Sequence, residues 1–193
     1  MTYLNTRPVG GADPCHVSVD QEDSHLYCAN FMSGSVTVLP MEEDGSLGEQ
    51  CCFIQHKGCS VHPQRQRGPH AHGVFFAPDG VHLYVPDLGT DRVVCYRCAE
   101  NGALRPEPDR DIPAPSLGLG PRHMVFHPSG KYLYVNTEMG STVHAYRYDA
   151  ATGQTVLLQS LSTLPADCAR TDSTTAAIKM HPGGRLLYVS LSL

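Results

Sequence analysis

The chain of 193 residues has a formal net charge of −5 and no block of Lys or Arg, which argues against a surface for nucleic acid or anionic membranes. No stretch approaches the roughly 20 apolar residues of a membrane span, and residues 1–11 lack the apolar core of a signal peptide. With 18 Gly, 15 Pro and short runs of β-branched and aromatic residues, the composition predicts an all-β, cytoplasmic protein.

The first predicted unit, residues 15–66, sets an order of strands that the rest of the chain repeats. An apolar run leads through a turn to a second run, and a polar loop, an alternating strand, a second turn and a weaker strand follow. The second unit, residues 70–115, and the third, residues 122–161, have the same order. Residues 176–193 supply half of a fourth unit. We therefore expect four antiparallel strands from each complete unit.

A Leu-Tyr pair marks the second predicted strand of each unit. The pairs are Leu26-Tyr27, Leu83-Tyr84, Leu133-Tyr134 and Leu187-Tyr188. Their tyrosines are 57, 50 and 54 residues apart, a period typical of propeller blades or solenoid turns. The second turn keeps the same register, because Gly45, Gly102 and Gly153 follow the matching tyrosine after 18, 18 and 19 residues.

Four antiparallel strands in each repeat of about 50 residues indicate a β-propeller. A β-sandwich does not explain four pairs in register, and a β-solenoid needs a shorter repeat. Closed propellers have about four to eight blades, whereas this chain supplies about three and a half. We therefore expect residues 1–193 to form one incomplete propeller domain, with blades missing at both ends.

The eight cysteines do not have the spacing of a zinc module. Cys51 and Cys52 are adjacent, and Cys95 and Cys98, three apart on a predicted strand, point to opposite faces. We expect free, buried thiols rather than disulfides.

Polar residues gather where the first strand of each unit begins and the second ends, and in an antiparallel blade these positions share one edge. The first strand is expected to lie innermost, so this edge surrounds one mouth of the central channel. The residues at these positions are His16, His70, His72, Arg122 and His123 before the first strands, and Asn30, Asp87 and Glu138 after the second.

Structural roles are open for several of these residues. His70 and His72 share a face and could bind a metal, but no third ligand is nearby, and we predict no metal. Asp87 could hold its own loop by accepting backbone N–H groups, and Arg122 with Glu138 could be a structural ion pair. Elsewhere, His127 and His181 are expected to hydrogen-bond turn backbone.

These stretches resemble the propeller-type 6-phosphogluconolactonases and their relatives, the fungal carboxy-cis,cis-muconate cyclases. The resemblance covers almost the whole chain and a little over half of a seven-bladed family member. The matching motifs are Pro14-Cys15-His16, Ala29-Asn30-Phe31, Pro69-His70-Ala71-His72, Val85-Pro86-Asp87-Leu88-Gly89-Thr90, Gly120-Pro121-Arg122-His123 and Asn136-Thr137-Glu138. Family members also carry an Asn-Arg-Gly loop after a Leu-Tyr-Val-Ser stretch; residues 187–190 match that stretch, and residues 191–193 do not match the loop.

The resemblance implies a hydrolase of the pentose phosphate pathway that opens 6-phospho-glucono-1,5-lactone without a cofactor. It implies active-site roles for the His70/His72 segment, Arg122 and Glu138, and we predict His72, Arg122, His123 and Glu138 as the catalytic residues. The chemistry suits these residues, since Glu138 or His72 can act as a base, and Arg122 with His123 can hold an oxyanion or a phosphate. We place His16, Asn30, His70 and Asp87 as substrate-binding residues.

Two other functions fit the same channel mouth. A cycloisomerase of the muconate type would take a dicarboxylate there, and a non-catalytic propeller would only bind a ligand. The expected partner in the leading hypothesis is a phosphorylated sugar lactone. The sequence does not specify an oligomeric state.

Overall fold

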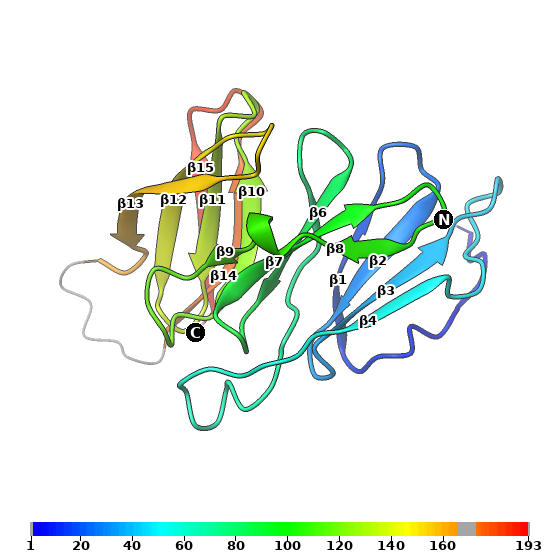
Figure 1. The fold of residues 1–193 in the computed structure, drawn as a ribbon, viewed down its shortest axis with the longest axis horizontal. Coiled ribbons are helices and arrows are strands. Elements are labelled where there is room, and N and C mark those ends of the chain that lie inside the picture. Colours follow the sequence, from blue (N-terminus) through cyan, green and yellow to red (C-terminus); the bar gives the residue numbers. More distant parts are fainter. Residues whose placement is uncertain (1, 166–172, 193) are drawn as a thin grey trace.

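The computed structural model describes residues 2–165 and 173–192, which form consecutive antiparallel sheets (Figure 1). The first sheet has the order β1 (Pro14–Val19), β2 (His25–Asn30), β3 (Ser35–Pro40), β4 (Cys52–Gln55). The second has β5 (Phe75–Phe76), β6 (His82–Asp87), β7 (Arg92–Cys98) and β8 (Leu104–Pro106), with the short β9 (Ile112–Pro113) beside β7. A single turn of 3-10 helix, η1 (Pro108–Arg110), connects β8 to β9.

The third sheet has the order β10 (Pro121–Phe126), β11 (Tyr132–Thr137), β12 (Thr142–Tyr148), β13 (Thr155–Ser162). A pair follows, β14 (Thr174–Met180) with β15 (Leu187–Ser192). The prediction of an all-β chain built from four-stranded antiparallel sheets is confirmed, and β9 is an addition that the sequence did not indicate. Among the described residues, no helix is long and apolar enough to cross a membrane.

The Leu-Tyr pairs lie in the second strand of each sheet, where the two side chains face opposite neighbours. Tyr27 packs edge-on against Phe76 of the second sheet, and Tyr84 packs against Phe126 and Tyr148 of the third. Burying an aromatic side chain of this size stabilises the fold by about 1.5–3 kcal/mol. The Leu-Tyr repeat therefore reflects the packing of each sheet against the next.

Two hydrophobic clusters form the core, one on each face of the second sheet. The first joins residues of β2 and β3 to residues of β6 and β7. The second joins β6 and β7 to β10, β11 and β12. The second sheet is therefore buried on both faces, and every strand of it is held in place by a neighbouring sheet.

Each sheet has an offset of one residue near the start of its first strand. The register shifts after Pro14 in β1, after Pro121 in β10 and after Thr175 in β14. In the second sheet, the isolated bridge between Ala71 and Asp87 and the later pair Phe75–Tyr84 differ in register by one residue, as in the other sheets. Such bulges redirect a side chain without ending the pairing. The residues that directly follow these four positions are Cys15, His72, Arg122 and Ala176.

The predicted turn glycines have the backbone conformation that the pattern required. Gly45, Gly102 and Gly153 have φ values of 83°, 76° and 73°, in the left-handed region that glycine adopts without strain. The seven described cysteines are free thiols, as predicted. Fewer of these cysteines are buried than we expected: Cys28 and Cys95 are buried, whereas Cys15, Cys51 and Cys59 are exposed. Cys168 lies outside the described residues.

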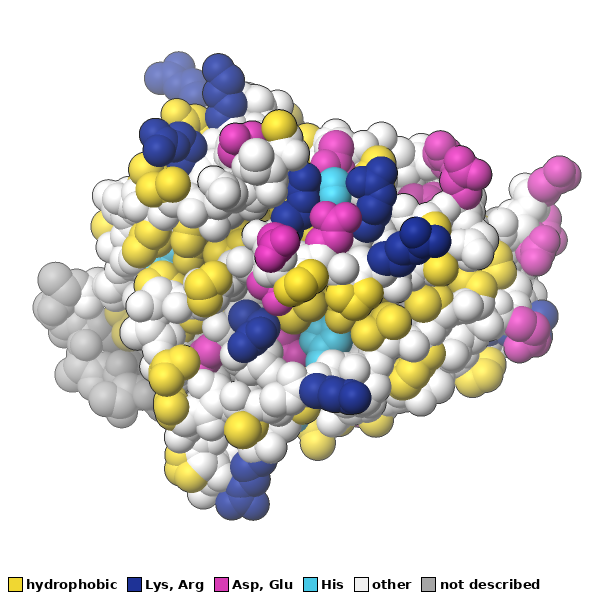
Figure 2. Space-filling model, in the orientation of Figure 1, with side chains coloured by type: hydrophobic (Ala, Val, Ile, Leu, Met, Phe, Trp, Pro, Cys, Tyr) yellow, Lys and Arg dark blue, Asp and Glu magenta, His cyan; other side chains and the backbone are white. Residues whose placement is uncertain are grey.

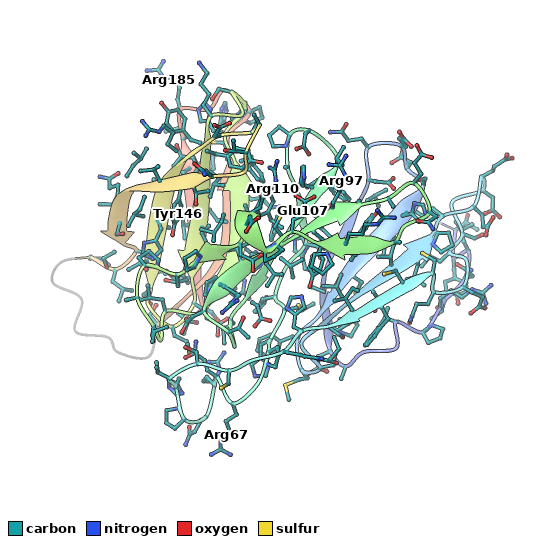
Figure 3. The ribbon with its side chains drawn as sticks, viewed as in Figure 1. Arg67, Arg97, Glu107, Arg110, Tyr146 and Arg185 are labelled. Carbon is teal, nitrogen blue, oxygen red and sulfur yellow. The ribbon has the colours of Figure 1, made fainter. Side chains whose placement is uncertain are left out.

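Figure 2 shows one face of the molecule, on which charged side chains of both signs lie side by side near the centre. An ion-pair chain joins the second sheet to η1: His82 contacts Asp79 at 2.7 Å and Glu107 at 3.3 Å, and Glu107 contacts Arg110 at 3.1 Å. Glu107 and Arg110 lie next to each other at η1 (Figure 3). This chain fastens the η1 segment to the start of β6.

Candidate functional site

The carboxylate of Glu138 is the centre of a charged cluster at the predicted edge. Glu138 directly follows β11, and its backbone N–H donates to the Gly120 carbonyl at 2.8 Å. Arg122 donates from Nε to Oε2 at 2.9 Å, and Arg65 donates from Nη2 to Oε1. His72 lies on the Arg122 side, with Nε2 3.6 Å from Oε2. Of these four residues, Arg122 lies in β10, Glu138 directly follows β11, and His72 and Arg65 belong to the connection between β4 and β5.

Arg122 is held at two points. Besides Glu138, its Nη1 donates to the Ala176 carbonyl at 2.7 Å, and its side chain is 20% exposed. Because Arg122 follows the bulge of β10, its side chain reaches across to β14. A guanidinium fixed in this way presents its remaining N–H groups in one direction, which suits recognition of an oxyanion.

Three imidazoles lie close together beside the cluster. The ring of His123 lies 5.1 Å from that of His16 and 5.4 Å from that of His72, centroid to centroid. Burial, together with the nearby cations of Arg122 and Lys179, lowers the pKa of His16 to about 4 and that of His123 to about 3. Burial and Arg122 also lower the pKa of His72. All three imidazoles are therefore neutral at pH 7 and able to accept a proton.

Cys15 lies beside this group, with Sγ 3.8 Å from Nδ1 of His72. Cys15 is exposed as a whole residue, but its Sγ packs 3.6 Å from the Ala29 carbonyl and 3.7 Å from the Ala71 carbonyl. Desolvation of the thiol, together with the nearby Cys28, raises its pKa to about 11. Since the thiolate is the reactive form of cysteine, Cys15 packs here as a thiol and is not a nucleophile at neutral pH.

Asp87, the last residue of β6, is fully buried and saturated with hydrogen bonds. Its Oδ1 accepts the backbone N–H groups of His70, Gly89 and Thr90 at 2.8–3.1 Å. Its Oδ2 accepts Nδ1–H of His56 at 2.6 Å. The alternative of a loop-holding aspartate thus matches the geometry, and a substrate contact for Asp87 stays a prediction.

Asn30 and His70 also make internal contacts. Asn30 ends β2, and its Nδ2 donates to Ser35 at 3.2 Å and to Thr37 at 3.0 Å. His70 donates from Nδ1 to the Phe31 carbonyl at 3.0 Å and stacks on the Phe31 ring. Phe31 also contacts His72 edge-on. The sequence analysis predicted that Asn30 and Asp87 follow their strands. In the structure each is instead the last residue of its strand, β2 or β6.

The structure therefore brings together the four residues predicted as catalytic, namely His72, Arg122, His123 and Glu138, with His16 next to them. Sequence reasoning missed Arg65, which reaches Glu138 across 73 residues from an irregular loop. It also missed His56. As predicted, His127 and His181 accept turn N–H groups at 3.0 Å. Within the described ranges, no three His, Cys, Asp or Glu side chains are placed to hold a metal ion.

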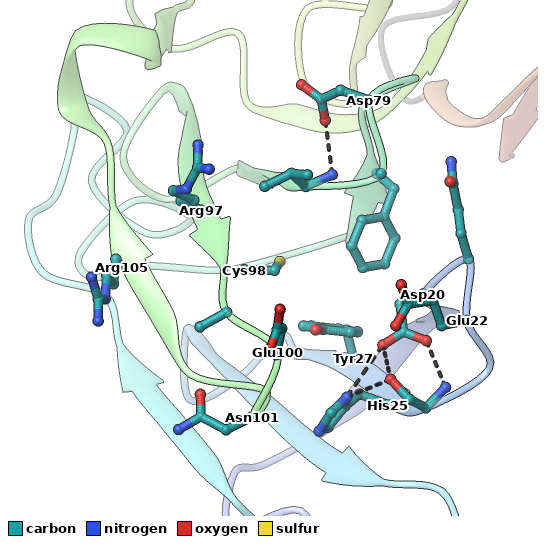
Figure 4. A pocket seen from close by; sticks show the side chains of 16 residues that line it. Asp20, Glu22, His25, Tyr27, Asp79, Arg97, Cys98, Glu100, Asn101 and Arg105 are labelled. Carbon is teal, nitrogen blue, oxygen red and sulfur yellow. Dashed lines mark hydrogen bonds and ion pairs between the residues drawn. The ribbon is translucent and has the colours of Figure 1, made fainter.

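Two cavities adjoin the sheets. One of about 460 Å³ lies against the first strands of the sheets, and its lining includes His16, Met124 and Lys179. Another, of about 750 Å³, lies at the opposite edge between the first and second sheets (Figure 4). There Asp20 accepts hydrogen bonds from Ser24 and lies 3.2 Å from His25, which closes the β1–β2 turn.

Comparison with known proteins gives consistent matches. The family model "Lactonase, 7-bladed beta-propeller" matches residues 1–191. A 6-phosphogluconolactonase of Bacillus subtilis (strain 168) is 37% identical over 190 residues, which are 98% of this chain and 53% of the relative. A crystal structure from Bacteroides fragilis has a TM-score of 0.87 at 33% identity, covering 98% of this chain and 53% of that one. The periplasmic gluconolactonase of Pseudomonas aeruginosa has a TM-score of 0.83 at 34% identity, covering 93% and 50%.

Proposed function

Because the chain belongs to the lactonase family of seven-bladed β-propellers, we propose that the protein hydrolyses a sugar-phosphate lactone, 6-phospho-glucono-1,5-lactone. The resemblance inferred from the motifs is confirmed. The chain spans about half the length of the curated relatives it matches, with 53% of the Bacillus subtilis protein covered. That share supports the further proposal that the described sheets are blades of a larger, seven-bladed ring, with residues 1–193 as one partial domain.

The observation that carries the proposal is the shared carboxylate of Glu138. Its Oε2 lies 2.9 Å from Arg122 Nε and 3.6 Å from His72 Nε2. The second distance is longer than a direct hydrogen bond and too short for a water in line between the two atoms, but a water lying beside them can contact both. A water that contacts both the neutral imidazole and the carboxylate can lose its proton to this pair as it attacks the lactone carbonyl.

Arg122 then has the charge to stabilise the oxyanion that forms on the carbonyl oxygen. When the tetrahedral intermediate collapses, the bond between the carbonyl carbon and the ring oxygen breaks. The proton held by the His72–Glu138 pair passes to that ring oxygen, and the open-chain acid leaves. His123 packs against His72 and keeps its ring in place. This sequence of steps consumes one water and uses only side chains of the cluster.

The test is hydrolysis of the phosphorylated lactone, corrected for its spontaneous opening in buffer. We expect a rate that is proportional to protein concentration, with no turnover of carboxymuconate. Turnover of carboxymuconate alone would assign the site to a cycloisomerase, and binding of 6-phosphogluconate without any turnover would assign it to a binding platform. A role in the pentose phosphate pathway and a cytoplasmic location are parts of the same proposal, and cell fractionation tests the latter.

A further inference from the structure

The two arginines at Glu138 differ in how they are held. Arg122 is fixed by Glu138 and by the Ala176 carbonyl, and its side chain is 20% exposed. The side chain of Arg65 is 42% exposed, and Glu138 Oε1 is its partner within the described residues. Arg65 is the more exposed guanidinium and has one ion-pair partner, so it can exchange that partner for a ligand at a lower cost than Arg122, which would give up two contacts.

The loop that carries Arg65, residues 56–70, is anchored at its base. Asp87 binds His56 at one end of the loop and the His70 N–H at the other. Between them, Gln66 donates to the Leu88 carbonyl at 2.8 Å and is fully buried. The backbone next to Arg65 is therefore held against the second sheet. The exposed side chain can change its rotamer, and with it its partner, while the backbone stays in place.

The two oxygens of Glu138 face different surroundings. Oε2 lies toward His72 and Arg122, where the lactone carbonyl is proposed to react, and Oε1 lies toward Arg65. A substrate whose carbonyl sits at the first position can therefore extend its far end toward Arg65. The phosphate of the proposed substrate is at the far end of the sugar, and a guanidinium matches a phosphate with two parallel hydrogen bonds.

Resting on the proposed function, we infer that Arg65 is the specificity-determining residue that recognises the phosphate of the substrate. On binding, its guanidinium leaves Oε1 of Glu138 and pairs with the phosphate oxygens. Arg122 keeps Glu138 in place during this exchange, because its own contacts do not involve Arg65. No covalent step depends on Arg65.

The experiment compares two lactones, with and without the 6-phosphate, in the wild-type protein and in Arg65→Met, Arg65→Lys and Arg67→Met variants. Arg67 is the matched control, since it lies on the same loop, contacts the Pro63 carbonyl and projects away from the molecule (Figure 3). We expect Arg65→Met to raise KM for the phosphorylated lactone about 10- to 100-fold, as for loss of a charge-assisted hydrogen bond. KM for the unphosphorylated lactone and kcat for both should change by less than about 3-fold.

Arg65→Lys should recover part of the loss, and Arg67→Met should behave as wild type. An equal fall in kcat with both lactones would overturn the inference, because it would make Arg65 a residue that positions Glu138. If the wild type turns over neither lactone, the proposed function fails, and calorimetric binding of 6-phosphogluconate and gluconate still tests Arg65. Preferential binding of the phosphorylated acid that Arg65→Met abolishes supports the inference, and equal binding of both acids contradicts it.

Discussion

Nδ1 of His56 lies 2.6 Å from Oδ2 of Asp87, and both side chains are buried. The same carboxylate accepts the N–H of His70 through its other oxygen. One aspartate thus closes residues 56–70 into a loop, and that loop delivers Arg65 to Glu138 on the third sheet. The charged cluster depends on this junction although Asp87 is not part of it.

Asp87→Asn should lower the free energy of unfolding by about 2–3 kcal/mol, because the amide cannot accept both sets of hydrogen bonds and leaves a buried donor without a partner. Urea denaturation at pH 7 measures this. Asp149→Asn is the control, since the exposed Asp149 also accepts two turn N–H groups but is solvated, and its loss should amount to less than about 1 kcal/mol. Equal losses in the two variants would argue against a special role for the buried junction.

Glu138→Gln should lower kcat at least about 100-fold, because it removes the proton-accepting carboxylate while keeping the size of the side chain. The far-ultraviolet circular dichroism spectrum should not change. Glu100→Gln, in the cavity at the opposite edge, serves as the control and should retain full activity. Wild-type turnover by the Glu138 variant would remove Glu138 from the proposed mechanism.

Arg122→Lys should lower kcat about 100-fold for lactone hydrolysis, with little change in stability. A lysine keeps the charge but cannot contact Glu138, the Ala176 carbonyl and an oxyanion at once, as the guanidinium fork can. The measurement is steady-state hydrolysis at saturating lactone. Arg97→Lys, on the opposite edge, is the reference, and a similar kcat for the two variants would refute the assignment.

Stability should fall as the pH drops from about 6.5 toward 4. Burial lowers the pKa of His123 to about 3 and that of His16 to about 4, from an ordinary value of 6.5, so the unfolded chain binds protons that the folded chain does not. Each such group contributes up to about 1.4 kcal/mol per pH unit in this window. Urea denaturation at several pH values should give a shallower dependence for His123→Gln, and an unchanged one for the turn variant His181→Gln. A slope that is the same in all three proteins would show that the imidazoles are not the cause.

The sequence predicted those parts of the molecule that follow a repeating rule. The Leu-Tyr pairs located the second strand of each sheet, and hairpin geometry then put Arg122 and Glu138 at one edge. Arg65 and His56 could not be found in this way, because they belong to a connection without strand periodicity. Their positions depend on tertiary hydrogen bonds to Asp87 and Leu88, which leave no local pattern.

At the register shift near the start of each first strand, the side chain can vary without a change in the pairing of the strands. The residue after the offset is Cys15, His72, Arg122 or Ala176 in successive sheets, so a thiol, an imidazole, a guanidinium and a methyl group occupy equivalent places. Sheet pairing continues on both sides of a bulge whatever its side chain. A repeated fold can therefore diversify its reactivity copy by copy at one position. A library randomised at these four residues would sample new ligand chemistry while the ladders of backbone hydrogen bonds stay as they are.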